Sequence, residues 1–219
     1  MVCLGTGQDR YKIGLDMRVI RIQAEQTHDW LLRKHYAKRI PQITDAFGLY
    51  DGKVLIGIVT YGKPATPMLC KGVCGEQYFD IVYELNRVCL ADNKQNQASF
   101  LVGQSLRQLA KPKIIVSYAD TGMGHTGFIY QACNFLYTGL TVARTDVDTN
   151  GKHARHGQKF DASKRVQRPQ KHRYIYFVGS KGQKRELLSN LRYEQHPYPK
   201  ADIKNYDSSA QISTQMIMF

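Results

Sequence analysis

The sequence predicts an α/β domain in which helices flank a mixed, mainly antiparallel sheet, with a basic loop inserted near the C-terminal end. Asp51-Gly52 lies between two alternating apolar runs, which is typical of a β-hairpin. Residues 98–110 carry apolar side chains at helical spacing, and a run rich in β-branched residues follows at 114–119. Strands and helices that follow one another in this way indicate a single sheet covered by helices.

The other elements follow from local signals. We expect further strands at residues 18–24, 46–50, 54–61, 78–90 and 174–178 and one that begins at Phe135, and further helices at 28–39, 128–134 and 184–191. Residues 62–75, which contain Pro64 and Pro67, are expected to form a loop. Residues 1–17 are expected to be an extension, 18–199 a single domain and 200–219 a polar, partly disordered tail.

Charge and composition limit the function classes. Lys and Arg number 31 against 18 Asp and Glu, so the net charge of +13 favours a polyanionic partner, nucleic acid before a membrane surface. The sequence has no apolar run long enough to span a bilayer and no secretory signal pattern. Five scattered cysteines favour reduced thiols in a cytoplasm, and the Cys70–Cys74 spacing without a second close pair argues against structural zinc.

Residues 114–139 are the most distinctive stretch. A strand ends at Asp120, and a glycine-rich turn around His125 leads into a helix. A carboxylate in this position either takes part in chemistry or only caps the turn. Glu84 and Asn86 share one face of the strand at 78–90, and that face either lines a cleft or is half exposed.

Three further side chains have open interpretations. His35 and Tyr36 lie beside the apolar stripe of the first predicted helix, which is typical of core residues with satisfied polar ends. Ser105 lies on the apolar face of the helix at 98–110, where a serine usually bonds back to a helix carbonyl but can also face a pocket.

Residues 150–173 have no apolar periodicity and read as a functional loop. Asp161 is the only acid among its charged residues. A DNA phosphate backbone is the natural partner for the basic residues, which are Lys152, Arg155, Lys159, Lys164, Arg165, Arg168, Lys171 and Arg173.

The element order resembles the GNAT acyltransferase fold. In that fold a glycine-rich turn before the helix that follows the long strand cradles the pyrophosphate of an acyl-CoA donor. The corresponding turn here, residues 92–98, contains no glycine, so a standard acetyl-CoA site is in doubt and the donor stays unknown.

Four segments together resemble the bacteriophage Mom proteins: residues 32–41 (LRKHYAKRIP), 83–90 (YELNRVCL), 117–139 (SYADTGMGHTGFIYQACNFLYTG) and 196–200 (HPYPK). The resemblance implies a GNAT-like enzyme that converts adenine in phage DNA to its N6-carbamoylmethyl (methylcarbamoyl or acetamido) form and so protects the DNA from host restriction. It also implies that the residues associated with activity are Asp120, Tyr130, Ser105, His35 and Tyr36, the last two with a link to bound iron.

The chemistry then expected is proton removal from the adenine amine by Asp120, or by Glu84 as the alternative base. The adenine must leave double-stranded DNA to be reached, so base flipping is expected. The host cytoplasm is the expected location. The alternatives are a conventional acetyltransferase acting on a small amine or protein, and a DNA-binding protein without catalytic activity.

Overall fold

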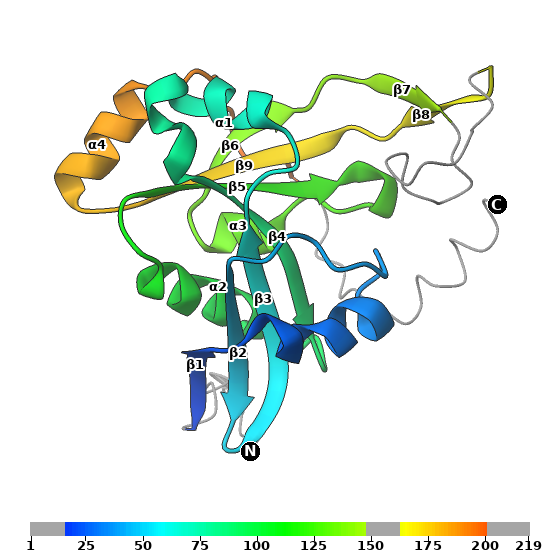
Figure 1. Cartoon of the computed structure of the whole chain (residues 1–219), viewed down its shortest axis with the longest axis vertical. Helices are drawn as coiled ribbons and strands as arrows, with labels where there is room; N and C mark the ends of the chain where they lie inside the picture. Colours follow the sequence, from blue (N-terminus) through cyan, green and yellow to red (C-terminus); the bar gives the residue numbers. More distant parts are fainter. Residues whose placement is uncertain (1–15, 148–162, 201–219) are drawn as a thin grey trace, which may run out of the picture.

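The computed structural model describes residues 16–147 and 163–200, which build a seven-stranded sheet with helices on both faces (Figure 1). Its strands, in spatial order, are β1 (Met17–Arg21), β2 (Asp45–Asp51), β3 (Val54–Gly62), β4 (Val82–Leu90), β5 (Lys113–Asp120), β9 (Lys171–Val178) and β6 (Leu136–Leu140). Only β4 and β5 pair in parallel, so the mixed, mainly antiparallel sheet expected from the sequence is confirmed.

Helices cover the two faces of this sheet. The α-helices are α1 (Pro67–Cys74), α2 (Gln97–Gln108), α3 (Phe128–Ala132) and α4 (Lys181–Ser189). Shorter helical turns are η1 (Ala24–Thr27), η2 (Trp30–Lys34), η3 (Glu76–Ile81) and η4 (Thr121–Met123). In the described ranges no helix has the length and apolarity needed to cross a membrane.

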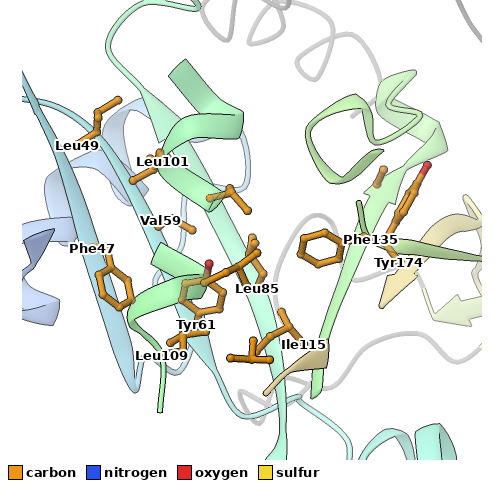
Figure 2. Packing of buried hydrophobic residues seen from close by; sticks show 14 of the residues in the cluster. Phe47, Leu49, Val59, Tyr61, Leu85, Leu101, Leu109, Ile115, Phe135 and Tyr174 are labelled. Atoms are coloured by element: carbon orange, nitrogen blue, oxygen red, sulfur yellow. The ribbon is translucent and has the colours of Figure 1, made fainter. Parts of the chain in front are cut away.

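The larger core lies where α2 packs on the sheet, and Figure 2 shows Leu101 of α2 opposite Val59 and Leu85 of the strands. A second core on the other face joins α1 and α4 to β5 and β9 through residues such as Val73, Leu187 and Ile175. Each helix thus buries one apolar stripe, which is the arrangement that excludes most water from both faces of a sheet.

The β4–β5 pair opens toward one end of the sheet. Its register has only three rungs, Val82–Glu84 against Ile114–Val116. One residue further, the Ser117 hydroxyl donates to the Leu85 carbonyl at 3.0 Å. Beyond this point the two strands no longer pair, and this end of the β4–β5 pair is called the open end below.

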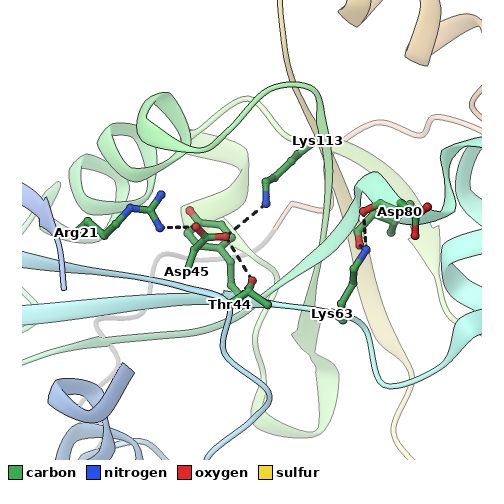
Figure 3. A network of polar contacts seen from close by, with 8 residues as sticks. Arg21, Thr44, Asp45, Lys63, Asp80 and Lys113 are labelled. Carbon is green, nitrogen blue, oxygen red and sulfur yellow. Dashed lines mark hydrogen bonds and ion pairs between the residues drawn. The ribbon is translucent and has the colours of Figure 1, made fainter. Parts of the chain in front are cut away.

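The opposite end of the sheet is closed by a charge network (Figure 3). The Asp45 carboxylate lies 2.5 Å from Arg21 Nη1 and 3.4 Å from Lys113 Nζ. Burial raises the pKa of Asp45, but the Arg21 hydrogen bond and the Lys113 charge outweigh it and hold this pKa below its usual value. The Lys113 ammonium also lies 3.4 Å from the centre of the Tyr83 ring, so its charge has two partners.

Two predictions from the sequence, a helix at 28–39 and a loop at 62–75, were wrong. The helix expected at 28–39 ends at Lys34, because its turns bury only Leu31 and the chain becomes extended at His35, which is then buried. The expected loop at 62–75 contains α1. Pro67 is its first helical residue, a position where proline favours helix, and Cys70, Val73 and Cys74 form its buried stripe.

Two strand boundaries also differ. Residues 76–81 form the turn η3, so β4 begins at Val82 rather than at 78. The end of the expected basic loop is regular, because β8 (Arg165–Arg168) pairs with β7 (Arg144–Val147) and β9 begins at Lys171. Backbone ladders need no apolar side chains, so charged residues concealed these strands from the sequence pattern.

Candidate active site

Asp120 ends β5 at the open end of the β4–β5 pair. Its Oδ1 accepts a hydrogen bond from the Gly122 amide at 3.0 Å, and its Oδ2 lies 3.2 Å from Lys171 Nζ. The side chain is only 19% exposed. Asp120 therefore caps the turn η4, which was one of the two roles considered from the sequence. It also forms an ion pair with Lys171 on the neighbouring strand β9.

Three aromatic side chains lie over this strand end. His35 stacks on Tyr36 with ring centres 4.4 Å apart, and Tyr36 meets His125 edge-on at 5.8 Å. The His125 amide donates to the Asp120 carbonyl at 3.0 Å, so the glycine-rich turn positions the His125 ring. His125 therefore contacts Tyr36 beside the end of β5, so it does more than shape the loop.

His35 is neutral in this environment. Burial, followed by the nearby charges of Arg87, His125 and Lys38, lowers the pKa of His35 to about 3. Its Nδ1 accepts a hydrogen bond from the Ala37 amide at 3.1 Å, which leaves the proton on Nε2. Burial, opposed by Arg87, raises the pKa of Tyr36, so its phenol keeps its proton at neutral pH.

Glu84 and Arg87 of β4 add two charged groups to this end of the sheet. Burial raises the pKa of Glu84, while Arg87, Lys171 and Arg39 oppose this change. The Arg87 Nε is buried without a hydrogen-bonding partner among the described residues, and its Nη1 donates to the Asn86 carbonyl. The sequence analysis did not single out Arg87, although it lies in the YELNRVCL segment; an arginine next to Asn86 on a strand with apolar residues at both ends was the available signal.

Tyr130 reaches the same region from α3. Its ring packs on Phe135 and Tyr174 with ring centres 5.4 and 5.3 Å away. Burial raises the pKa of Tyr130, while Ser117, Tyr36, Glu84 and Arg87 are polar neighbours that also affect it. Tyr130 is therefore a neutral phenol close to the opening between β4 and β5.

Ser105 lies in the core, away from the open end. It is fully buried, donates to the Val102 carbonyl at 2.9 Å and lies 2.6 Å from the Tyr61 hydroxyl. Because its one proton goes to Val102, the Tyr61 hydroxyl must donate to Ser105 Oγ. The structure thus brings together five of the six expected residues around the open end: His35, Tyr36, Glu84, Asp120 and Tyr130.

The expected DNA-contacting residues fall into three groups. Lys152, Arg155 and Lys159 lie outside the described residues. Lys164, Arg165 and Arg168 lie on or next to β8 and are exposed. Lys171 pairs with Asp120, and the Arg173 guanidinium is held by Thr138 Oγ1 at 2.9 Å and by the Tyr193 ring at 3.4 Å.

The residues present do not form an obvious iron site. Over residues 16–147 and 163–200, no group of three or more His, Cys, Asp or Glu side chains is placed to hold a metal ion. His35 Nδ1 is already used by the Ala37 amide. Cys70 and Cys74 are buried in α1, and burial raises the pKa of the Cys74 thiol to about 11, which disfavours the thiolate that binds metal.

A groove lies between α2 and α3. The groove measures about 360 Å³ and includes Asn96, Ser99, Gly103 and Cys133 in its walls. Asn96, which caps α2, takes a left-handed conformation with φ of 65°, a geometry that asparagine adopts more readily than most residues other than glycine. The turn at 92–98 therefore forms a tight bend without the glycine expected of a CoA-binding turn.

The sequence and the fold were compared with known proteins. The sequence model of the Mom protein family matches residues 16–200. Methylcarbamoylase Mom of Escherichia phage Mu is 27% identical over 215 residues, which cover 86% of this chain and 87% of that protein.

Among solved structures, an acetyltransferase from Bacillus subtilis in complex with CoA aligns with a TM-score of 0.44 at 14% identity, over 74% of this chain and 99% of that one. A GNAT-family acetyltransferase from Bacillus cereus aligns with a TM-score of 0.42 at 10% identity, over 75% and 99%.

The family match includes every candidate site residue described above, from His35 before β2 to Lys171 on β9. It extends from the first strand to the segment after α4. With a match over most of its length, the chain belongs to the Mom protein family.

Proposed function

We propose that the protein transfers a carbamoylmethyl group to N6 of adenine in phage DNA, in the cytoplasm of the host bacterium, where the product resists host restriction. Membership of the Mom family and the similarity to a protein named methylcarbamoylase support a DNA-modifying transferase. The observation that carries the proposal is the group at the open end of the β4–β5 pair. Two carboxyl groups, an arginine and three aromatic rings meet there, beside an exposed basic ribbon.

The substrate adenine must leave the duplex, since its N6 lies inside a stacked helix. In the proposed complex the flipped base packs against the Tyr36 and His125 rings. Neutral rings suit this contact, and the lowered pKa of His125, caused by burial and opposed by Asp120, keeps that ring uncharged at neutral pH.

In the reaction, a bond forms between N6 and the methylene carbon of the donor, the donor's leaving group departs with its electron pair, and N6 loses one proton. Asp120 is fixed by Gly122 and Lys171, so it accepts a hydrogen bond from the amine and orients it. Glu84 is better suited to take the proton, because burial brings its pKa closer to neutral. Arg87, whose Nε has no hydrogen-bonding partner among the described residues, supplies a positive charge for charge that develops on the donor.

The donor groove is proposed to be the space between α2 and α3, and Tyr130 then stands between donor and base. A bound donor with its leaving group on the methylene carbon would supply the carbamoylmethyl group. Ser105 is proposed to act indirectly, through Tyr61, because its hydroxyl is already engaged within the core.

The test is mass analysis of nucleosides in DNA from cells that express the protein or its variants. We expect an adenine adduct with the unaltered chain, and at least about a 100-fold loss with Asp120→Asn and with Glu84→Gln. Asp80→Asn is the matched control, because Asp80 is an exposed carboxylate on η3, at the far end of the sheet.

Normal adduct levels in folded Asp120→Asn would refute its assigned role. An acetylated small amine or protein with no DNA adduct would instead identify a conventional acetyltransferase. DNA binding without any adduct or acetylated product would identify a DNA-binding protein without catalytic activity.

A further inference from the structure

The ribbon of β7 and β8 leaves the sheet next to Asp120 (Figure 1). Its base is fixed to that strand end, because the Gln170 carbonyl accepts from the Thr121 hydroxyl at 2.6 Å and Gln170 Nε2 donates to the Thr141 carbonyl at 2.7 Å. The Lys171 amide also donates to Thr141 Oγ1 at 3.0 Å. The ribbon is therefore positioned relative to the candidate active site, although it is not part of the main sheet.

Most of the ribbon is exposed. All four residues of β8 are exposed, as are Arg144 and Thr145 of β7. A two-stranded ribbon exposed in this way is marginally stable in water, which favours a partner that covers it. In the ribbon and at Lys164 just before it, four cations face the single acid Asp146, which Arg168 pairs at 3.0 Å. This excess of positive charge favours a polyanion as the binding partner of the ribbon.

The two faces of the ribbon differ in chemistry. Arg144 and Arg168 lie opposite each other on one face, which also carries Asp146 and Val166. Thr145 and Gln167 lie opposite each other on the second face. Arg165, on that second face, donates from its Nε to Thr145 Oγ1 at 3.3 Å, so the Thr145 hydroxyl keeps its proton to donate.

Gln167 is the most informative of these residues. Its side-chain amide makes no hydrogen bond within the described part of the chain, and it is exposed beside the Thr145 hydroxyl. A primary amide offers one donor and one acceptor in a plane, which matches the edge of adenine in the major groove. The major groove admits a two-stranded ribbon, and phosphates on its walls suit arginines.

We propose that the β7–β8 ribbon enters the major groove of duplex DNA beside the modified adenine, where Thr145 and Gln167 read base edges and Arg144 holds phosphate. The proposal rests on the proposed function for its substrate. Gln167 precedes Lys171, the partner of Asp120, by four residues, a reach of at most about 13 Å or roughly four base-pair steps. The ribbon thereby sets the sequence context in which adenine is modified.

The experiment uses the purified full-length chain and a library of random 20-base-pair duplexes. Bound duplexes are sequenced, and affinities of selected duplexes are measured at two salt concentrations. Gln167→Ala, Arg144→Ala and the control Gln77→Ala are compared; Gln77 is an exposed glutamine on η3, at the far end of the sheet. All three positions are on the surface, and circular dichroism checks that each variant is folded.

We expect Gln167→Ala to relax the preference at one base pair by about 5- to 150-fold, the discrimination of one good amide–base contact. Arg144→Ala should weaken binding to all sequences and reduce its salt dependence without a change of preference. Gln77→Ala should leave both quantities unchanged.

An unaltered preference in Gln167→Ala, or no preference in the unaltered chain, overturns the proposal. These outcomes are separate from a failure of the proposed function, because binding is read without any chemistry. If the sequence preference depends on Gln167 but no adenine adduct forms in cells, the proposed function is refuted and the proposed role of the ribbon in DNA recognition is retained.

Discussion

Replacing Ser105 by alanine separates a role in the core from a role in catalysis. Tyr61 is fully buried, and its hydroxyl donates to Ser105 Oγ at 2.6 Å, while Ser105 in turn donates to Val102. In Ser105→Ala the Tyr61 hydroxyl loses its acceptor inside the larger core (Figure 2). A buried polar group left without a partner costs about 1–3 kcal/mol, so we expect this loss in the free energy of unfolding.

The partner substitution should behave differently. In Tyr61→Phe the serine keeps its bond to the Val102 carbonyl, so no buried donor is stranded and the loss should stay near 1 kcal/mol. The double variant Ser105→Ala/Tyr61→Phe removes both hydroxyls and should be more stable than Ser105→Ala alone. For a chain of 219 residues, 1–3 kcal/mol corresponds to a fall in Tm of about 2–12 °C.

The assay combines thermal unfolding with measurement of the adenine adduct. If Ser105 supports activity through the core, the double variant should recover both stability and adduct relative to Ser105→Ala. An unchanged Tm in Ser105→Ala would refute the proposed hydrogen-bonding role. A double variant that is stable but inactive would instead mean that one of the two hydroxyls acts directly in the reaction.

Two further predictions concern stability. The pKa of His35 is about 3 in the folded chain, whereas an unfolded histidine takes up a proton below its usual pKa of 6.5. The free energy of unfolding should therefore fall as the pH drops below 6.5, by about 2 kcal/mol from this group at pH 5. Urea unfolding of His35→Gln should show a smaller loss of unfolding free energy between pH 7 and pH 5 than the unaltered chain shows. An equal loss in both proteins would contradict the lowered pKa of His35. Asp45→Ala should cost about 3 kcal/mol, because it leaves the nearly buried Lys113 without its acid, whereas Arg21→Ala, whose side chain is 51% exposed, should cost less than about 1 kcal/mol. Equal losses of unfolding free energy for the two variants, measured with urea at pH 7, would show that the Asp45–Lys113 pair contributes no more than the Arg21–Asp45 pair.

Much of the fold could be read from local patterns. The Asp51-Gly52 hairpin, the helix at α2 and the strand that ends at Asp120 all have signals within a few residues, and the structure contains each of them. The proline that begins α1 and the charged residues of β8 were misread, because the same residue types also occur in loops. The family resemblance was confirmed by the match over residues 16–200, which no periodicity could have supplied.

The sequence by itself determined the β2–β3 hairpin, the helix α2, the strand β5, the basic character and the family, because these depend on residues close together in the chain or on whole segments. Only the tertiary structure decided which polar residues meet. It brought His35, Glu84 and Asp120 to the open end of β4 and β5, added Arg87 and His125, and left Ser105 in the core. The physical reason is strand pairing. A three-rung register between two parallel strands fixes where they separate, and that register depends on packing across the whole sheet rather than on either strand alone.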